Sequence, residues 1–446
     1  MSKRINNLII FFFLTICCFI VYYNSFNGVF ISDDHPCLIE YTAINFLSSN
    51  WSYLPSFLNT IAFKISGLHT FGHHFISIFL HAINSFLAFL FLKIFFKKEV
   101  SFLGALIFAV HPIHTECVTW ISGRSYSVIS FLMLSCYLSY YKKKLYPLSI
   151  ALFLYGITNF VGSFVMFPFV LLFSDFYLGE NKKRIVPFFL VLLIGILFNF
   201  NVIADRFILS DCVTYSGEKL FGAFVTFFES KNHFHWTVIP FNFIYNSKLL
   251  CFPLNLTFYH EKLFIIKDVV THFFVYILTI MCILSSLLAG KGVVKKFWFI
   301  LVLFLLSLFP SNSPINVCSI IAERYLYFPS VFFCMFICVI IEFLYKFRYF
   351  VFVPLFCFYS FLTIQRNCDY FSELTFWKKT ALVSPYSSRA HNNLGIEYLK
   401  TRENKMALEC FVKSYNLDNT NKNAFNNMML VAKKFKNAKI KIQSKR

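Results

Sequence analysis

Charged residues are scarce in this sequence. Asp, Glu, Lys and Arg make up 14% of the 446 residues, whereas they make up about a quarter of a typical soluble domain. Hydrophobic residues reach 58%, and the mean hydropathy is +0.65. This shortage of charge excludes an ordinary soluble globular domain. Because apolar runs recur along most of the chain, the sequence predicts an all-α, multi-spanning membrane protein.

The sequence also lacks paired cysteines. It contains 14 Cys, but none are arranged as CxxC, the spacing typical of zinc and thiol-redox sites. Cys17 and Cys18 are adjacent within an apolar run, where Cys usually behaves as a small hydrophobic residue. Cysteine usage therefore predicts no metal site and does not settle the redox compartment.

Acidic residues are outnumbered by basic ones. There are 21 Asp and Glu against 41 Lys and Arg, for a formal net charge of +20. The basic residues stand in short clusters between apolar runs, as topology signals do, so we expect no nucleic-acid partner. Lys3 and Arg4 precede an apolar run that lacks a small-residue cleavage site. This pattern indicates an uncleaved first span rather than a signal peptide.

About eleven spans are expected from runs near the 20 apolar residues that cross a bilayer. They are 7–25, 73–96, 101–117, 120–141, 145–160, 163–179, 185–203, 270–290, 297–311, 328–345 and 349–365. Six basic clusters then share one side, the cytoplasmic side by the positive-inside rule. They are Lys3-Arg4, Lys97-Lys98, Lys142 to Lys144, Lys182 to Arg184, Lys291 with Lys295 and Lys296, and Lys346 with Arg348.

The opposite, extracytoplasmic side receives the loop 26–72, the turn 111–124, the mixed segment 204–269, the loop 312–327 and the tail 366–446. One part of them, 236–259, is apolar but is broken by Pro240 and Pro253. We expect it to be re-entrant or interfacial, because irregular backbone at membrane depth needs protein or a cavity around it. Ionisable residues from separate loops meet on this side, a pattern typical of an active site.

The composition becomes polar near the C-terminus, which divides the chain into a membrane domain, 1–365, and a helical tail, 366–446. Three residue pairs in the tail are 34 positions apart: Ser384 and Asp418, Ala390 and Ala424, and Asn393 and Asn427. This is the tetratricopeptide period, and it predicts a repeat over 384–435. Because about three repeats are needed for independent stability, we expect the tail to dock on the membrane domain or on another chain.

Asp33 and Asp34 follow the first span in the sequence Ser-Asp-Asp-His-Pro. A carboxylate here could take a proton from an acceptor hydroxyl, and a second carboxylate could position the acceptor or raise the pKa of the base. The alternative is a helix N-cap or turn, because Asp near Pro favours both.

His111, His114 and Glu116 lie between two apolar runs. Ionisable groups packed against membrane segments are candidates for function. They could contact a phosphate or an acceptor group, or the His residues could sit at the membrane interface. A metal site is the third possibility, and we rank it last because Pro112 disfavours a regular helix through the pair.

Arg124 follows Gly123 at the start of the next apolar run. A fixed cation at the membrane surface suits a lipid-linked phosphate, which Arg can bind bidentately; the alternative is interfacial snorkelling. Glu323 and Arg324 open the tenth predicted span. They could form a local ion pair, or Arg324 could face a phosphate leaving group.

Taken together, these segments resemble the transmembrane and tetratricopeptide repeat-containing family of O-mannosyltransferases and its bacterial relatives. The matching pieces are SDDHP, FAVHPIHTECVTWISGR, CFPLNLTFYH, IAERYLYFPSVFF, RNCDYFSELTFWKKTALVSP and the repeat that begins at Ser384. They occur in the family's order and cover most of the chain. The HPIHTE, WISGR and AERYLYFPS blocks are the specific ones.

The resemblance implies a GT-C fold. Such enzymes move a sugar, here expected to be mannose, from a polyprenyl-phosphate donor to an acceptor hydroxyl, expected to belong to a protein, although a glycan acceptor is open. The reaction takes place on the lumenal or periplasmic side, in the endoplasmic reticulum of a eukaryote or the inner membrane of a bacterium. Asp33 or Asp34 would be the catalytic base. The candidates for donor and acceptor binding are His111, His114, Glu116, Arg124, Glu323 and Arg324. No cofactor is required by this chemistry, and a divalent cation is left open.

One departure from the family pattern concerns activity. Relatives commonly carry Ser-Lys-Glu ahead of the sixth span, where this chain has Val161-Gly162 within the sequence Asn-Phe-Val-Gly-Ser. Two other classes of function are therefore kept open. One is an inactive membrane scaffold that presents a helical-repeat tail, and the other is a transporter of lipid-linked sugars.

Overall fold

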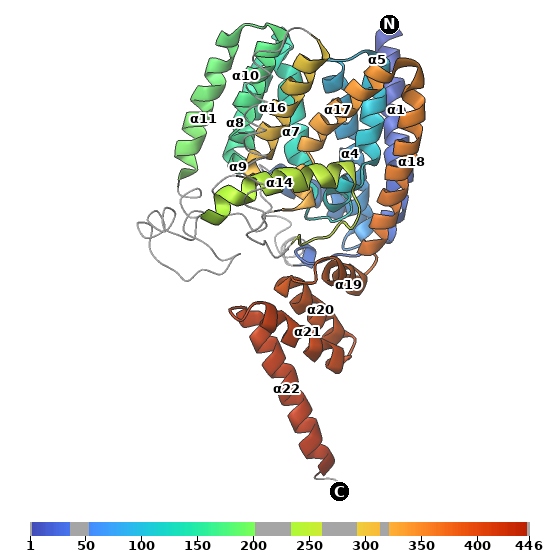
Figure 1. Cartoon of the computed structure of the whole chain (residues 1–446), viewed down its shortest axis with the longest axis vertical. Helices are drawn as coiled ribbons and strands as arrows, with labels where there is room; N and C mark the ends of the chain where they lie inside the picture. The colour runs from blue at the N-terminus through green and yellow to red at the C-terminus, as the bar shows by residue number, and fades with distance from the viewer. Residues whose placement is uncertain (1, 36–52, 201–232, 261–291, 313–320, 444–446) are drawn as a thin grey trace.

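The computed structural model describes residues 2–35, 53–200, 233–260, 292–312 and 321–443, and within these ranges the chain forms helices and no strands. The longer helices of the membrane domain stand side by side as a bundle (Figure 1). They are α1 (Ser2–Tyr22), α4 (Thr70–Leu92), α5 (Lys98–Val110), α7 (Arg124–Tyr140), α8 (Tyr146–Asn159), α10 (Phe167–Leu178), α11 (Val186–Phe198), α16 (Val293–Asn312), α17 (Pro329–Leu344) and α18 (Arg348–Asn367).

Four helical stretches within the described residues could cross a membrane by their length and composition. They are Asn7–Asn27, Thr70–Leu92, Val161–Leu178 and Pro329–Tyr370. A bent pair, Lys98–Val110 with Pro112–Val118, adds a fifth if its two helices count as one span. These stretches support a multi-pass helical membrane protein. The count of about eleven spans stays a prediction, and the expected span 270–290 lies outside the described residues.

Prolines and glycines mark where these helices begin and end. Proline stands in the first turn of α8, α10, α11 and α17, where its missing N–H costs no hydrogen bond. Gly179 ends α10 in the left-handed conformation, with φ at 72°, which a side chain would disfavour. Gly104 lets α5 approach α17, because a Cβ there would lie 2.4 Å from Cys338 Sγ.

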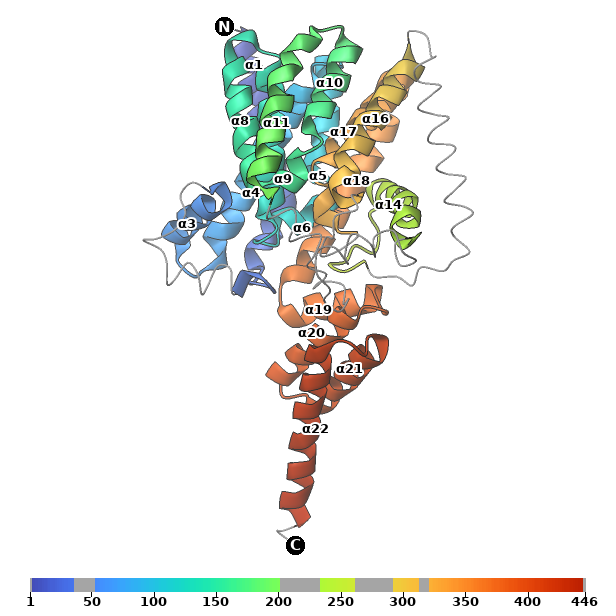
Figure 2. The ribbon, with the colours of Figure 1, turned by 90° about the vertical axis from the view of Figure 1, so that its left-hand side faces the viewer.

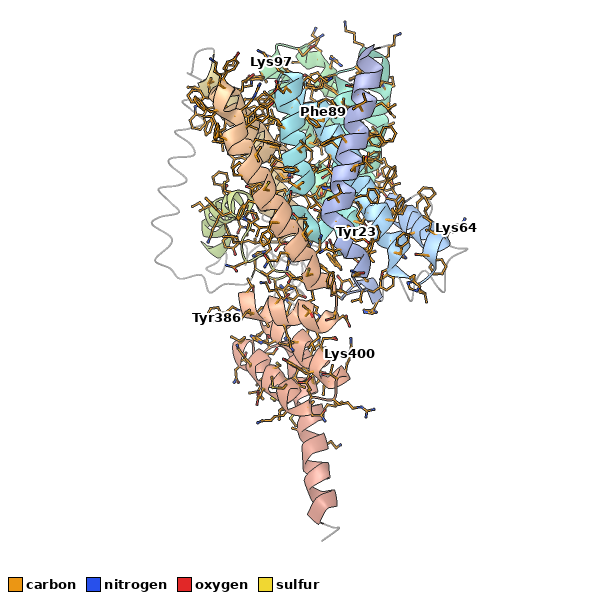
Figure 3. The ribbon with its side chains drawn as sticks, turned by 90° about the vertical axis from the view of Figure 1, so that its right-hand side faces the viewer. Tyr23, Lys64, Phe89, Lys97, Tyr386 and Lys400 are labelled. Carbon is orange, nitrogen blue, oxygen red and sulfur yellow. The ribbon has the colours of Figure 1, made fainter. Side chains whose placement is uncertain are left out.

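Basic residues gather at one end of the bundle. Lys97 marks this end in Figure 3, opposite the tail. Ion pairs join the elements that meet there: Arg348 Nη2 lies 2.8 Å from Glu99 Oε1, and Lys296 Nζ lies 2.8 Å from Glu342 Oε2. This arrangement is the one expected if the basic clusters share a side of the membrane.

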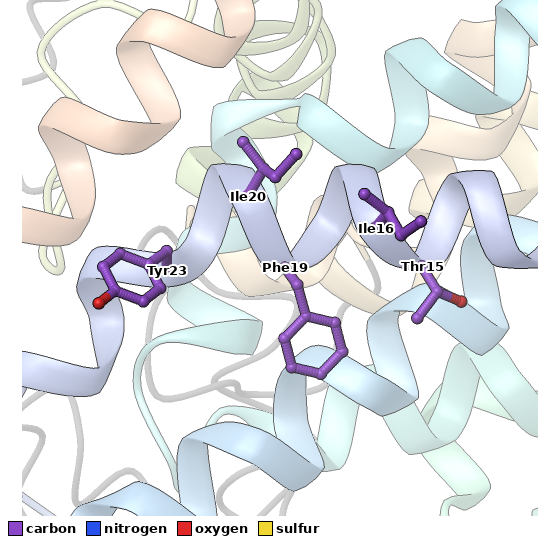
Figure 4. A pocket seen from close by; sticks show the side chains of 5 residues that line it. All are labelled: Thr15, Ile16, Phe19, Ile20 and Tyr23. Atoms are coloured by element: carbon purple, nitrogen blue, oxygen red, sulfur yellow. The ribbon is translucent and has the colours of Figure 1, made fainter.

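The outer face of α1 is apolar and exposed. Ile16 is 59% and Ile20 66% exposed, and together with Thr15, Phe19 and Tyr23 they line a shallow hollow along the helix (Figure 4). An outward apolar face of this kind is expected of a helix that contacts lipid. The hollow is lined by hydrocarbon and lies apart from the ionisable residues singled out in the sequence.

Two helices lie outside the upright bundle. α14 (His233–Cys251) crosses it at the tail-side end (Figure 1), which agrees with an interfacial rather than a spanning position for 236–259. α3 (Leu54–Ser66) stands beside the bundle at the same end (Figure 2), in a segment for which we expected a loop. Its apolar residues and the proline in its first turn, Pro55, were the available signal.

The tail consists of α19 (Glu373–Val383), α20 (Ser388–Lys400), α21 (Asn404–Leu417) and α22 (Lys422–Gln443). α20 and α21 pack closely because Gly395 leaves room for Phe411, whose ring would lie 2.6 Å from a Cβ at that position. α22 begins 34 residues after α20 begins (422 minus 388). Asn427 Nδ2 donates to Asn392 Oδ1 at 3.0 Å between them.

The tail docks on the membrane domain, one of the two expected arrangements. Both contribute to a single hydrophobic cluster, in which Ile31, Trp120 and Phe258 of the membrane domain meet Tyr370, Phe376 and Trp377 of the tail. Polar contacts accompany this cluster: Val29 N donates to Tyr370 O at 3.1 Å, and Ser384 Oγ donates to Tyr259 O. The docking surface therefore includes the segment just before Asp33 and Asp34.

Candidate active site

The two aspartates after the first span occupy different environments. Asp33 is exposed, whereas Asp34 is buried, with 1% of its surface accessible. Asp34 Oδ2 accepts from Ile31 N at 3.0 Å, and Asp34 N donates to Ile31 O at 3.1 Å. The segment is thus a turn closed by Asp34, as the structural alternative predicted. A buried carboxylate in such a turn can still act on a substrate. Asp33, by contrast, is exposed and accepts a long hydrogen bond from Ser32 Oγ, at 3.4 Å.

Burial also changes the acidity of Asp34. Loss of solvent raises the pKa of its carboxyl from 3.8 to about 6, although hydrogen bonds from Ser122 and Ile31 and the positive charge of Arg124 oppose the rise. We expected that a second carboxylate could raise this pKa; the cause is desolvation instead. A carboxylate with a pKa near 6 is a stronger base than an exposed one and is still ionised at neutral pH.

The turn from Trp120 to Arg124 holds Asp34 from the other side. Ser122 donates twice to Asp34 Oδ1, from its backbone N at 2.8 Å and from its Oγ at 2.5 Å. Trp120 Nε1 donates to Ile31 O at 3.2 Å. Gly123 makes the turn possible, because a Cβ there would lie 2.1 Å from Glu116 O. The WISGR block thereby places Arg124 near the buried carboxylate.

Arg124 is buried at the start of α7, with 1% of its surface accessible. Its guanidinium donates to three neutral acceptors: Nε to Ser77 Oγ at 2.9 Å, Nη1 to Asn59 Oδ1 at 2.7 Å and Nη2 to His73 O at 2.6 Å. Within the described ranges no carboxylate forms an ion pair with it. Its charge is therefore balanced by no described carboxylate within ion-pair distance, and because the side chain is buried it is not the snorkelling surface cation of the alternative.

Glu116 and Arg324 form a buried pair. Arg324 Nη1 and its backbone N both donate to the Glu116 carboxylate, the latter at 2.8 Å. The guanidinium of Arg324 also lies 5.4 Å from the ring centre of Phe258 and 5.8 Å from that of Trp120, within the range of cation–π attraction. Arg324 is thus neutralised by protein, which leaves it less suited than Arg124 to bind a phosphate.

Glu323 belongs to a second cluster, so the local ion pair with Arg324, one of the two alternatives, is not formed. Glu323 Oε1 accepts from Thr257 N and lies 3.3 Å from His260 Nε2, while its Oε2 lies 3.6 Å from Arg366 Nη2. Arg366 Nη1 in turn lies 2.7 Å from Asp369 Oδ2. Adjacent side chains in a tight 3-10 helix point in different directions, so Glu323 and Arg324 reach different partners.

His111 and His114 are fully buried, so their side chains contact protein groups and face neither lipid nor solvent. His111 Nδ1 accepts from Ile113 N at 3.1 Å, so the proton is on Nε2, which donates to Leu250 O at 2.9 Å. His114 Nε2 lies 2.8 Å from Ser330 Oγ, and that hydroxyl donates to Tyr327 O. His111 thus ties the turn to the end of α14, and His114 ties it to α17.

Metal ligands do not cluster in the part of the chain that the structure describes, since no three His, Cys, Asp or Glu side chains are placed to hold one ion. His114 lies near His81, with ring centres 5.1 Å apart. However, His81 Nδ1 lies 2.6 Å from Tyr327 Oη and its Nε2 lies 3.1 Å from Ala109 O. Both nitrogens of His81 are therefore occupied by protein groups.

Several residues of the site were not singled out in the sequence. Ser122 holds Asp34, Asn59 and Ser77 hold Arg124, and His260 and Arg366 hold Glu323. A signal existed for three of them, because Ser122, His260 and Arg366 all fall inside the blocks WISGR, CFPLNLTFYH and RNCDY. Asn59 and Ser77 carried none, since single polar residues in apolar helices are common.

The contacts bring together most of the segments that carried the family resemblance. The block 111–124 binds the turn at Asp34, the block 321–329, the end of α14 and the end of α18. The predicted positions Asp34, Arg124, Glu116, Glu323 and Arg324 thus share one region at the tail-side end. No protein-family profile, curated protein or solved structure matches this chain.

Proposed function

We propose that this chain is a membrane glycosyltransferase of the GT-C type. It moves a sugar, with mannose as the first candidate, from a polyprenyl-phosphate donor to an acceptor hydroxyl, with protein Ser or Thr as the first candidate. The observation that carries the proposal is that a buried carboxylate, Asp34, lies near enough to a buried guanidinium, Arg124, for the two charges to influence each other, while no described carboxylate forms an ion pair with Arg124.

The reaction is a direct displacement. Asp34 takes the proton of the acceptor hydroxyl while that oxygen bonds to the anomeric carbon of the sugar. The bond between the anomeric carbon and the phosphate oxygen breaks, and its electron pair leaves with the polyprenyl phosphate. Arg124 stabilises the negative charge that grows on the leaving group. In this scheme Glu116, Arg324, Glu323, His111 and His114 hold the loops that position these two groups.

The membrane arrangement belongs to the same proposal. About eleven spans place the basic clusters in the cytoplasm and the site and tail in the lumen or periplasm. The tail is a short tetratricopeptide array that lies over the site. A protease cleavage site inserted at Lys143 and another inserted after Gln443 should be cut from opposite faces of sealed vesicles. Cleavage at both sites from one face would contradict the topology.

The direct test is transfer of radiolabelled mannose from polyprenyl-phosphate mannose by the purified full-length chain, with membrane extract as acceptor source. Asp34→Asn should lower the rate by about a hundredfold or more, the usual contribution of a general base. Asp33→Asn is the matched control, since Asp33 is exposed, and it should change the rate less than threefold. Equal losses, or none, would overturn the assignment of Asp34.

One observation favours a second function, that of an inactive scaffold. Val161 and Gly162 open the short helix α9 (Val161–Phe164) where relatives have Lys-Glu, so a polar pair expected near the donor is missing. A scaffold predicts no transfer from any lipid-phosphate sugar by a folded sample. Replacing Val161-Gly162 with Lys-Glu would then distinguish an enzyme from a scaffold. A gain of sugar transfer indicates an enzyme with altered donor binding, and no gain indicates a scaffold.

A further inference from the structure

We propose that Ser122 is a positioning residue that orients the Asp34 carboxylate and leaves its Oδ2 to receive the acceptor proton. The proposal rests on the function proposed above and deepens it. A carboxylate offers about four acceptor sites. Three are filled, because Ser122 N and Ser122 Oγ donate to Oδ1 and Ile31 N donates to Oδ2. The remaining site, on Oδ2, receives no hydrogen bond from the part of the chain that the structure describes.

The turn that carries Ser122 cannot shift freely. Trp120 is held by Ile31, Gly123 lies directly against the backbone of Glu116, and Arg124 is held at three nitrogens. Ser122 and Arg124 are only two residues apart in this turn. The same few residues therefore fix the base and the cation relative to each other, and a misplacement of about 1 Å between such groups costs about a hundredfold in rate.

The charges around Asp34 must be counted before any pH effect is assigned to Ser122. Arg124 faces Asp34 from the start of α7 and lowers its pKa. Other titratable groups flank the turn, from the same segment, from α4 and from the tail: Asp33, His35, His73, His74, Glu373 and Lys400. Ser122 does not titrate, so its side chain can be removed without altering the charge around Asp34.

The experiment compares Ser122→Ala, Ser122→Thr and the matched control Ser130→Ala. Ser130 is a fully buried serine of α7, whereas Ser122 is half-buried, and within the described residues the Oγ of Ser130 has no hydrogen-bond partner. Ser122→Ala removes one donor to the ionised form, so the acidic limb of the pH profile for mannose transfer should move up by about one unit. The rate at pH 7 should fall by about tenfold: about twofold because fewer Asp34 carboxyls are ionised at that pH, and the rest because the carboxylate is no longer held in its orientation. Ser122→Thr should restore the limb, and Ser130→Ala should match the parent.

A second readout does not depend on activity. The carboxyl band of Asp34, assigned by its loss in Asp34→Asn, is titrated by infrared spectroscopy in the full chain. Ser122→Ala should raise this titration midpoint by the same amount. If no lipid-phosphate sugar is transferred but the midpoint still shifts, the proposed function fails and the role of Ser122 stands. If the midpoint and the rate of Ser122→Ala match the parent, the role of Ser122 is wrong.

Discussion

Glu116 and Arg324 are 208 positions apart in the sequence, and their side chains form an ion pair that is almost completely buried. Removing both charges from water is costly, so such a pair persists only with good geometry and further hydrogen bonds. Here the carboxylate also accepts from Arg324 N. The pair joins the block 111–124 to the block 321–329, which makes it a structural bond between two halves of the candidate site.

Glu116→Gln should therefore destabilise the protein. Loss of the carboxylate leaves the Arg324 cation buried without a counter-charge, which costs about 3–5 kcal/mol in buried pairs. Thermal unfolding in detergent measures the change. The matched control is Glu342→Gln, which breaks the pair with Lys296 at the opposite end, where Glu342 is 40% exposed. That change should cost less than about 1 kcal/mol. A similar loss in both variants would contradict the structural role of the first pair.

The pH dependence of stability follows from Asp34. In the folded chain the Asp34 carboxyl keeps its proton up to about pH 6, whereas in the unfolded chain it loses that proton near pH 4. The folded state thus binds more protons in this window, and the free energy of unfolding falls as pH rises through it. The full effect is on the order of 3 kcal/mol, because a difference of one in pKa between the folded and unfolded states corresponds to about 1.4 kcal/mol. It is present below pH 4 and lost above pH 6.

Asp34→Asn isolates the contribution of the Asp34 carboxyl to stability. The free energy of unfolding of this variant should not decrease between pH 4 and pH 6 as that of the parent does. Asp33→Asn should keep the fall, since that side chain is exposed. Chemical unfolding at a series of pH values measures the difference between each variant and the parent. Parallel curves for the parent and Asp34→Asn would mean that the carboxyl is not desolvated in solution.

The general architecture could be predicted from composition, but the site could be predicted only in part. Apolar runs and basic clusters indicate a helical bundle with one basic end, because these patterns are local in sequence. The distinction between Asp33 and Asp34 is not local: it depends on Ser122, which is 88 positions away. The partners of Glu323 and Arg324 could likewise not be predicted from the sequence. These two residues are neighbours in the chain, but each pairs with side chains from a distant segment and not with the other.

Tail docking should depend on Phe376, which is fully buried and packs against Tyr370 and Phe258, with ring centres 5.1 and 5.3 Å away. Phe376→Ala should cost about 3–5 kcal/mol of packing and loosen the tail. Limited proteolysis should then cut between the membrane domain and α20 at a higher rate than in the parent. Leu382→Ala is the control, because Leu382 is 75% exposed in the same helix. Equal cleavage of the two variants would contradict the docking surface.

Gly123→Ala should test whether the Ser122–Arg124 turn is rigid. The backbone of Gly123 is ordinary, with φ at −65°, so alanine introduces no conformational strain of its own. Its Cβ, however, would lie 2.1 Å from Glu116 O and 2.9 Å from the Trp120 ring. A backbone atom cannot yield as a flexible side chain does, so we expect a loss of about 3 kcal/mol, at or above the usual cost of overpacking.

The clash in Gly123→Ala also displaces Ser122 and Arg124, so mannose transfer should fall by more than the fraction of unfolded protein explains. Gly179→Ala provides the contrast. Gly179 has φ at +72° with open space around it, so alanine there should cost about 1–2 kcal/mol through backbone strain alone and leave transfer by the folded fraction unchanged. If Gly123→Ala unfolds at the same temperature as the parent and transfers mannose at the same rate, the Ser122–Arg124 turn is not rigid. The base and the cation are then not held at a fixed separation.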